Sequence, residues 1–347
     1  MNYKICLLKD DSTDPQLLQG LANILSVCQL KYKHTFELTQ GLIGGAALDK
    51  TGIALPQETV DICKLSDAIL IHSIGNNKHI DKFGIDQSRL SIHKLYSLLR
   101  LHTIIVALDH IGCIATSSSL KDKYTRDIKT KLVIDASRLF NNDKGYKTNT
   151  PQGMQAYDGT TITTNQISRI SMLAYDLAKF GKLKLTLVDL ADSSMSGLLW
   201  RQTVKKVGAL YPTVQFDSML IDDFVPQFVY NPQRFDIVIA DSIVGKLLSN
   251  IANSYAPIGS IPSAVIGHRN KGIFGALGYH NTTDPNPIGI IYALSQMFEY
   301  CFGLIDIAKT IQQSLFDAIK TSKPTAIGGK CSCNKFVDKV AINLLNC

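Results

Sequence analysis

Short apolar runs alternate with segments of helical periodicity along most of this sequence. Apolar runs such as YKICLL (3–8) and AILIHSI (68–74) end at turn residues, and helical patterns cover about 14–29 and about 56–65. This alternation is typical of α/β domains, in which helices cover the faces of a sheet. The 347 residues are enough for two domains of ordinary size, or for one elaborate domain with an insertion. We therefore expect an α/β protein.

A polar segment separates this first alternation from a second one. Residues 139–165 contain glycines and few helix formers. They predict either a long loop or a two-stranded arm, over about 141–165, that projects from the body. Beyond this segment, helical patterns and apolar runs such as KLTLVDL (184–190) alternate again. The sequence thus consists of two α/β portions with an irregular excursion between them.

Composition excludes several classes of protein. No apolar run approaches the ~20 residues that a membrane span needs, and the first residues, MNYKICLLKDD, predict a strand rather than a signal peptide. The eight cysteines are scattered apart from CSC (331–333), which indicates reduced thiols without a disulfide framework or a zinc site. The formal charge of +7 is spread along the chain without basic blocks. We expect a cytoplasmic protein with neither a membrane nor a nucleic acid as its partner.

Four segments carry a pattern that extends over nearly the whole chain. They are GGAALDKTGIALPQETVDICKLSDAILIHSIG (44–75), the segment from VDLADSSMSGLLW to FDIVIAD (188–241), GSIPSAVIG (259–267) and DPNPIGIIYALSQMFEY (284–300). Their order and spacing resemble those of the β-decarboxylating dehydrogenases, the family of isopropylmalate and isocitrate dehydrogenases. Because all four occur in the family's order, the resemblance extends to the fold.

The resemblance implies an isopropylmalate dehydrogenase-like two-domain α/β fold, with central mixed sheets flanked by helices. Residues 1–98 and 256–347 would form a large domain on the nucleotide side, and 99–255 a central domain that forms a homodimer interface. The active site would lie in the cleft between the domains. Members of the family transfer a hydride to a nicotinamide cofactor, polarise the resulting carbonyl with a divalent metal, and hold substrate carboxylates with arginines.

The metal positions of the family are altered in this sequence. The family places two aspartates four residues apart on one helix, and the neighbouring subunit supplies a third. Lys246 and Asn250 stand at the first two positions, and Asp222 matches the third. We expect no divalent metal, because a hard dication is not held beside an ammonium group by one remaining carboxylate. Lys246 is either an ordinary surface lysine or a replacement for the cation. The second case predicts a homodimer in which Lys246 of one subunit approaches Asp222 of the other.

The acid–base and carboxylate-binding positions of the family differ as well. Leu190 stands where the resemblance places the proton-transferring lysine, and an alkyl side chain cannot move a proton. Asp135 falls at an arginine position, and Tyr146, in the expected arm, is a weak substitute for the family's tyrosine. Arg100 and His102 lie near the segment of a further arginine but out of register, and we interpret them as surface residues.

The nucleotide positions of the family are partly retained. The glycine-rich turn after the first strand has become KDDSTDPQ, and the family's longer loop near the C-terminal part is shortened to GALGYHNTTDPNP. In this loop Gly275 and Gly278 replace a glutamate and a histidine, Asn286 remains of the adenine contacts, and His280 is able to stack on a ring. Binding of NAD or an adenine nucleotide through these four residues remains an open expectation.

Three hypotheses about function follow. The first is a divergent, catalytically inactive family member that acts as a binding or regulatory protein, and the joint loss of the metal, lysine, tyrosine and arginine positions favours it. The second is an NAD(P)-dependent dehydrogenase of a 2-hydroxy acid with altered residues, in which Lys246 and Asp222 would transfer the proton. The third is a non-catalytic subunit of a hetero-oligomeric dehydrogenase, paired with an intact paralogue.

Overall fold

The computed structural model describes all residues except 12, 73, 76–77, 110, 115–116, 118–124, 126, 137–144, 160, 269–270 and 277–284. Within the described residues, one mixed sheet has ten strands in the order β2-β1-β3-β12-β11-β4-β5-β10-β8-β9. These strands are β1 (Asn2–Lys9), β2 (Thr35–Leu42), β3 (Ala68–Ile71), β4 (Leu101–Ala107), β5 (Lys131–Asp135), β8 (Lys184–Asp189), β9 (Gln215–Leu220), β10 (Ile237–Ala240), β11 (Pro262–Gly267) and β12 (Gly272–Ala276).

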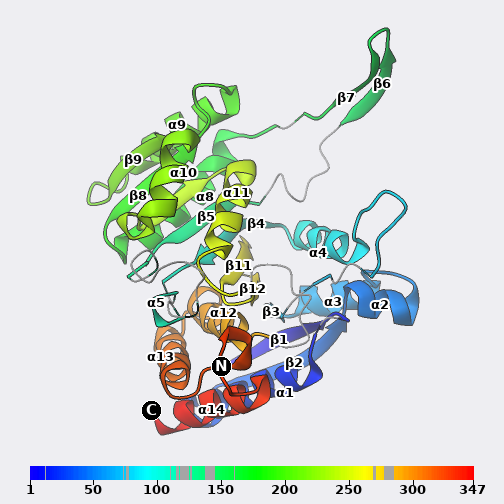
Figure 1. Cartoon of the computed structure of the whole chain (residues 1–347), viewed down its shortest axis with the longest axis vertical. Helices are drawn as coiled ribbons and strands as arrows, with labels where there is room; N and C mark the ends of the chain where they lie inside the picture. The colour runs from blue at the N-terminus through cyan, green and yellow to red at the C-terminus, as the bar shows by residue number, and fades with distance from the viewer. Residues whose placement is uncertain are drawn as a thin grey trace.

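Helices cover both faces of this sheet (Figure 1). They are α1 (Pro15–Tyr32), α2 (Gly44–Thr51), α3 (Gln57–Leu65), α4 (Gln87–Leu98), α5 (Ile111–Ile114), α8 (Thr164–Lys179), α9 (Met195–Gly208), α10 (Ile221–Tyr230), α11 (Ser242–Asn253), α12 (Pro287–Tyr300), α13 (Ile305–Thr321) and α14 (Cys333–Asn346). A separate hairpin, β6 (Tyr146–Thr150) and β7 (Gly153–Tyr157), projects from the body.

The strand order brings the two ends of the chain together. β1 pairs in parallel with β2 and β3, and β12, from the C-terminal part, pairs in parallel with β3. β11 and β4 are antiparallel to both of their neighbours. β5, β10, β8 and β9 are parallel to one another. The two parallel sets therefore run in opposite directions. Their C-terminal ends lie at opposite edges of the sheet, where an edge means a side along which strand ends lie, not an outer strand.

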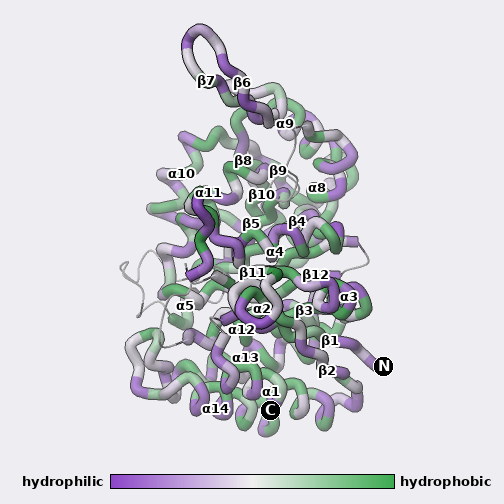
Figure 2. Tube along the Cα trace, turned by 90° about the vertical axis from the view of Figure 1, so that its right-hand side faces the viewer, coloured by the Kyte–Doolittle hydropathy of each residue, from purple (hydrophilic) through white to green (hydrophobic). Residues whose placement is uncertain are grey.

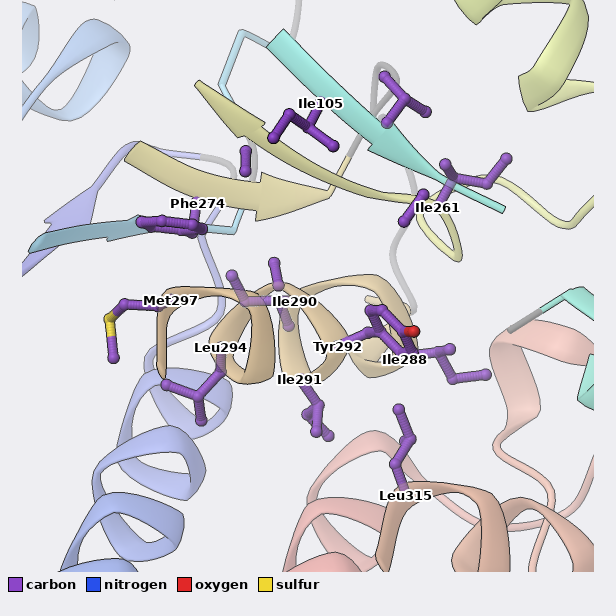
Figure 3. Close-up of a cluster of buried hydrophobic side chains, with 14 of the residues drawn as sticks. Ile105, Ile261, Phe274, Ile288, Ile290, Ile291, Tyr292, Leu294, Met297 and Leu315 are labelled. Atoms are coloured by element: carbon purple, nitrogen blue, oxygen red, sulfur yellow. The ribbon is translucent and has the colours of Figure 1, made fainter. Parts of the chain in front are cut away.

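The main core lies around α12, a helix that is buried from Pro287 to Phe298. In Figure 3, Ile290 points from α12 toward the strands that carry Phe274 and Ile105, and Ile291 points toward Leu315 of α13. Burying one such side chain contributes about 1.5–3 kcal/mol. Because both sides of α12 are apolar, this helix joins the sheet to the outer helices.

The part of the sheet that contains β8 and β10 has cores on both faces. Trp200 of α9 and Tyr175 of α8 belong to one buried cluster with Ile239 of β10. Phe224 of α10 and Val244 of α11 belong to the main cluster instead, on the other face. This arrangement follows from the period of two along β10, in which successive side chains point to opposite faces.

Local sequence sets the ends of several helices. Asp14 caps α1 by accepting the Gln16 N–H, and Pro15 occupies the first turn, where its missing N–H has no cost. Thr163 and Gln166 form a reciprocal capping box at α8. Asp241 caps α11 by accepting two N–H groups with one carboxylate oxygen. These caps place the first turn of α11 directly after β10.

The structure agrees with the main expectations from the sequence. The fold is mixed α/β with one large central sheet flanked by helices, and the helices expected over about 14–29 and about 56–65 are α1 and α3. The expected arm is the antiparallel β6–β7 hairpin, which is mainly hydrophilic in Figure 2. The domain boundaries near residues 98 and 256 stay a prediction, because one sheet runs through both portions.

Two further observations bear on the class of protein. All eight cysteines are free thiols, as expected from their spacing. No helix within the described ranges is both long and apolar enough to cross a membrane.

A glycine in α11 tests how closely this helix packs on the sheet. A Cβ on Gly245 would lie 2.2 Å from Cγ2 of the buried Ile134 in β5. Alanine favours helices by up to about 1 kcal/mol over glycine, but overpacking costs about 1–3 kcal/mol. We expect Gly245→Ala to lower the free energy of unfolding, measured by denaturant titration. The exposed Asn250→Ala on the same helix is the control and should leave stability unchanged or slightly higher. Equal stability of the parent and Gly245→Ala would contradict this packing.

Candidate functional site

The residues at the metal positions lie on the surface of the single chain. Lys246 and Asn250 are exposed on α11, and Asp222 is exposed in the first turn of α10. Lys246 lies near His93 of α4. Burial of His93 lowers its pKa, and the positive charges of Lys246 and Arg89 lower that pKa further. Among the described residues, no group of three His, Cys, Asp or Glu side chains is able to hold a metal ion. An ammonium and an amide on α11 do not fit a divalent cation, which prefers carboxylate oxygens.

The segment after β8 is occupied by structural contacts. Asp189, at the end of β8, is buried and binds Arg201 of α9 through two hydrogen bonds of 2.9 and 2.7 Å. Leu190 follows it, half-buried, and its side chain packs against the main core. The Leu190 carbonyl accepts the Ser194 N–H at 2.9 Å, and a Cβ on Gly197 would lie 2.6 Å from the Leu190 carbonyl carbon. Leu190 therefore has a packing role at this position.

Asp135 is part of a polar cluster at the C-terminal end of β5. Its side chain is 1% exposed and accepts a 3.3 Å hydrogen bond from the Ser242 hydroxyl at the start of α11. On α8, the half-buried Arg169 is close enough for Asp135 to raise its pKa, although burial lowers that pKa overall. Arg169 Nη1 lies 3.3 Å from Nε2 of His268, which follows β11. The cluster thus combines a guanidinium group with a buried carboxyl group.

His102, at the start of β4, belongs to the same cluster. Its ring lies edge-on to that of His268, with centroids 5.5 Å apart, and its Nδ1 lies 2.8 Å from the Thr103 hydroxyl. Burial is the main cause that lowers the pKa of His102 to about 4, and the charges of Arg169 and His268 add to this effect. His102 is therefore neutral near pH 7, and the cluster has the donors to bind a small anion. The interpretation of His102 as a surface residue is wrong, because its half-buried ring packs beside His268. The sequence named Asp135 separately, and no spacing signal pointed to Arg169 or His268.

Two other residues named from the sequence lie apart from the buried cluster. Arg100 is exposed, with a positive φ of 53° between α4 and β4. Tyr146 is 58% exposed on the β6–β7 hairpin. Their positions agree with the interpretation of Arg100 as a surface residue and give Tyr146 no contact with the cluster within the described part of the chain.

The turn after β1 contains a buried carboxyl group that the sequence analysis did not single out. Asp10 is 0% exposed, and its two oxygens accept the backbone N–H groups of Gly45 and Gly75, each at 2.7 Å. Burial raises the pKa of Asp10 to about 6, and the Gly75 hydrogen bond opposes this shift. Asp11 follows, and its carboxylate lies 4.0 Å from the Lys78 ammonium. Two carboxyl groups at this turn do not fit the phosphates of a dinucleotide, which need N–H donors or cations.

The remaining nucleotide positions have structural roles where they are described. Asn286 is 2% exposed; its amide donates to the Ile258 carbonyl and the Ser260 hydroxyl and accepts the Ile288 N–H. Gly275 is buried in β12, where a Cβ would lie 2.3 Å from the Ile71 carbonyl oxygen. Gly275 also lines a small cavity of about 70 Å³ beside His72. Gly278 and His280 lie outside the described residues. As cofactor contacts, all four residues stay a prediction.

Comparisons with known proteins agree with this architecture. The family model described as isocitrate/isopropylmalate dehydrogenase matches residues 4–340. A "3-isopropylmalate dehydrogenase" of Pseudomonas savastanoi pv. phaseolicola is 30% identical over 324 residues, which cover 91% of this chain and 90% of the relative. One of the same name from Buchnera aphidicola is 31% identical over 332 residues, covering 92% and 90%.

Solved structures show the same fold at low sequence identity. The isocitrate dehydrogenase from Methylococcus capsulatus superposes with a TM-score of 0.80 and 19% identity over 99% of each chain. A β-decarboxylating dehydrogenase from Thermococcus kodakarensis, in its apo form, gives a TM-score of 0.74 and 19% identity, covering 99% of this chain and 96% of the other. The family model spans nearly the whole sequence, and the fold agrees with it. This chain belongs to the isocitrate/isopropylmalate dehydrogenase family.

Proposed function

We propose that this chain is a catalytically inactive member of its family that acts as a binding or regulatory protein. The carrying observation is that the half-buried Leu190 packs against the core where the resemblance places a proton-transferring lysine. Two further observations support it. Lys246 and Asn250 present no carboxylate for a metal, and Asp135 is a buried acid at a substrate arginine position. Loss of one such group costs several kcal/mol of transition-state stabilisation, and loss of all of them removes the mechanism.

Asp10 supports the same proposal at the nucleotide end. A dinucleotide approaches such turns through glycine N–H groups, but the Asp10 carboxyl group already accepts the Gly45 and Gly75 N–H groups. A bound metal would act as a Lewis acid, and a bound dinucleotide would accept the hydride. The residues described at the positions of these two groups do not fit them. The remaining donors, Arg169 and neutral His102, suit the binding of a small anion such as a carboxylate.

A second candidate function is favoured by the names of the relatives. Proteins about 30% identical over nine-tenths of this chain are called 3-isopropylmalate dehydrogenase. On this alternative the chain would be an NAD(P)-dependent dehydrogenase of a 2-hydroxy acid that works without a metal, with Lys246 and Asp222 as the groups that transfer the proton. Within a single chain both side chains are exposed, so this alternative requires a second subunit to enclose them.

The surface of α10 and α11 supports a dimeric assembly. Ile243 and Leu247, one turn apart on α11, are 51% and 47% exposed, and Val229 of α10 is 39% exposed. Neighbouring apolar side chains on a surface are typical of an interaction site. Lys246 and Asp222 are on the same two helices. We infer that a second copy of this chain covers this face, with Lys246 of one copy beside Asp222 of the other; an intact paralogue is the alternative partner.

Catalytic inactivity is tested directly with nicotinamide cofactors. We expect no reduction of NAD or NADP above that of heat-inactivated protein when isopropylmalate or isocitrate is supplied with magnesium or manganese. The Pseudomonas savastanoi relative, assayed in parallel, is the positive control. Leu190→Lys by itself should not restore turnover, because the metal and arginine positions remain altered. Metal-dependent turnover would refute the proposal. Metal-independent turnover that Lys246→Ala abolishes would support the dehydrogenase alternative instead.

The dimer is tested by a double-mutant cycle. Lys246→Ala should raise the dissociation constant of the homodimer about tenfold or more, because it leaves a partly buried Asp222 carboxylate without its partner. Combination with Asp222→Asn should recover part of the loss. Lys205→Ala, which removes an exposed lysine of α9, is the matched control and should change nothing. Analytical ultracentrifugation over a concentration series measures the parent, the Lys246→Ala and Asp222→Asn single variants, the double variant and the control. A monomer, or a dimer indifferent to Lys246→Ala, would eliminate this contact.

A further inference from the structure

A cavity of about 770 Å³ opens away from the Asp135 cluster. It is lined by the N-terminal ends of β5 and β10, the end of α8, the end of α12 and the start of α13. Asp135 and Ser242, in contrast, lie at the C-terminal end of β5 and just beyond that of β10. The cavity therefore opens at the other edge of the sheet. Its volume is within the range of about 300–1,000 Å³ that is typical of small-molecule sites.

The floor of the cavity is a connected group of polar side chains. Lys131, the first residue of β5, points its ammonium toward Asp109, 3.8 Å away, and donates to the Tyr300 hydroxyl at 3.4 Å. Tyr292 donates to the other Asp109 oxygen at 2.7 Å. Tyr292 and Tyr300 are both on α12, two turns apart, so this helix holds the floor in place. The Lys131 contacts are long, and the ammonium and carboxylate retain capacity for a further partner.

The floor carries more acid than base. Glu299, half-buried at the end of α12, also lines the cavity, and within the described part of the chain it makes no ion pair. Burial raises the pKa of Glu299, an effect opposed by Lys131 and reinforced by Asp109. Burial alone would lower the pKa of Lys131, but Tyr300, Asp109 and Glu299 raise it above its ordinary value. One ammonium thus faces two carboxyl groups, and a second ammonium would balance them.

Among the described lining residues, the exposed rim is mainly basic, although it includes Asp176 of α8 as well as Lys129, Lys182 and Lys309. Lys309, on the exposed side of α13, is near enough to Glu299 to lower its pKa, and Lys129 is exposed on the strand side. Asp236 also lines the cavity, but its carboxylate accepts the Lys182 N–H at 2.6 Å and is held in the wall. A ligand that reaches both floor and rim would therefore meet carboxylates inside and mainly ammonium groups outside.

Apolar side chains line the space between floor and rim. Phe180, just after α8, is 91% exposed, and Ile305, at the start of α13, is 52% exposed, although both line the cavity. Leu177 also lines the cavity. Covering such exposed apolar side chains with a ligand removes them from water and favours binding.

We propose that this cavity binds a free amino acid with an apolar side chain. Its ammonium group lies between Glu299 and Asp109, its carboxylate faces Lys309 and Lys129, and its side chain covers Phe180 and Ile305. This zwitterion matches both the acidic floor and the basic rim, which a dicarboxylate or a diamine would match at one end alone. The site is separate from the Asp135 cluster, because the two lie at opposite ends of β5.

The test is a titration of the full chain with the twenty amino acids by calorimetry, with thermal shift as a second readout. We expect at least one apolar amino acid to bind, and its deaminated acid and its decarboxylated amine to bind at least about tenfold more weakly. Those two analogues separate recognition of the zwitterion from recognition of either charge. Saturating isopropylmalate or NAD should not displace the amino acid, since neither matches this cavity.

Variants assign the binding to this cavity. Lys309→Gln removes an exposed charge and should weaken binding at least about tenfold without loss of folding. Glu299→Gln, which removes a carboxylate from the floor, should also weaken binding at least about tenfold without loss of folding. Lys320→Gln, on α13 but outside the cavity, is the matched control and should bind like the parent. The proposal is overturned if no amino acid binds, if the analogue lacking one charge binds as well as the parent amino acid, or if Lys309→Gln and Glu299→Gln both bind normally.

Discussion

The antiparallel pairing of β4 with β11 and β5 in the middle of the sheet determines the layout of the molecule. Ile104 pairs with Ile134 of β5, and Ile105 with Ala264 of β11, so β4 joins the two parallel sets by backbone hydrogen bonds on both sides. Because the sets run in opposite directions, polar residues that follow β1 and β3 lie at one edge and those that follow β5 and β10 at the other. α12 then covers the junction with an apolar surface.

Several positions where the family resemblance predicts chemistry have instead acquired contacts within the chain. Leu190 packs against the core, Asp135 accepts the Ser242 hydroxyl, and Asp10 accepts two backbone N–H groups. A buried carboxyl group costs free energy unless hydrogen bonds satisfy it, and both aspartates have such bonds. The altered residues are thus integrated into a well-packed fold, which accommodates them without loss of the family's architecture.

The edge with the large cavity is organised in a different manner. Lys131, Asp109, Tyr292 and Tyr300 link the start of β5 to α12 through a chain of polar contacts. Gln296, which α12 places one turn from both tyrosines, is 1% exposed, and its amide atoms have no partner within the described residues. α12, which is apolar toward the sheet, thus has polar side chains at successive turns, and the last of them, Tyr300, lines the cavity. An unpartnered buried amide weakens packing locally.

The periodicity of the sequence determined the fold class and much of its local structure. Alternating apolar runs and helical patterns predicted the α/β architecture, α1, α3 and the two-stranded arm, because these depend on residues close in the chain. The order of conserved-looking segments identified the family, and single positions such as Leu190, Lys246 and Asp135 were found from it.

Only the tertiary structure decided which side chains meet. Asp135, Arg169 and His268 come from β5, α8 and the end of β11, and Lys131 and Tyr300 are 169 residues apart. Asp10 was missed because its neighbours in sequence give no sign that Gly45 and Gly75 approach it. Local sequence patterns report the conformational preferences of nearby residues. Burial, charge balance and the shape of a cavity arise instead from contacts between distant segments, and the strand order brings those segments together.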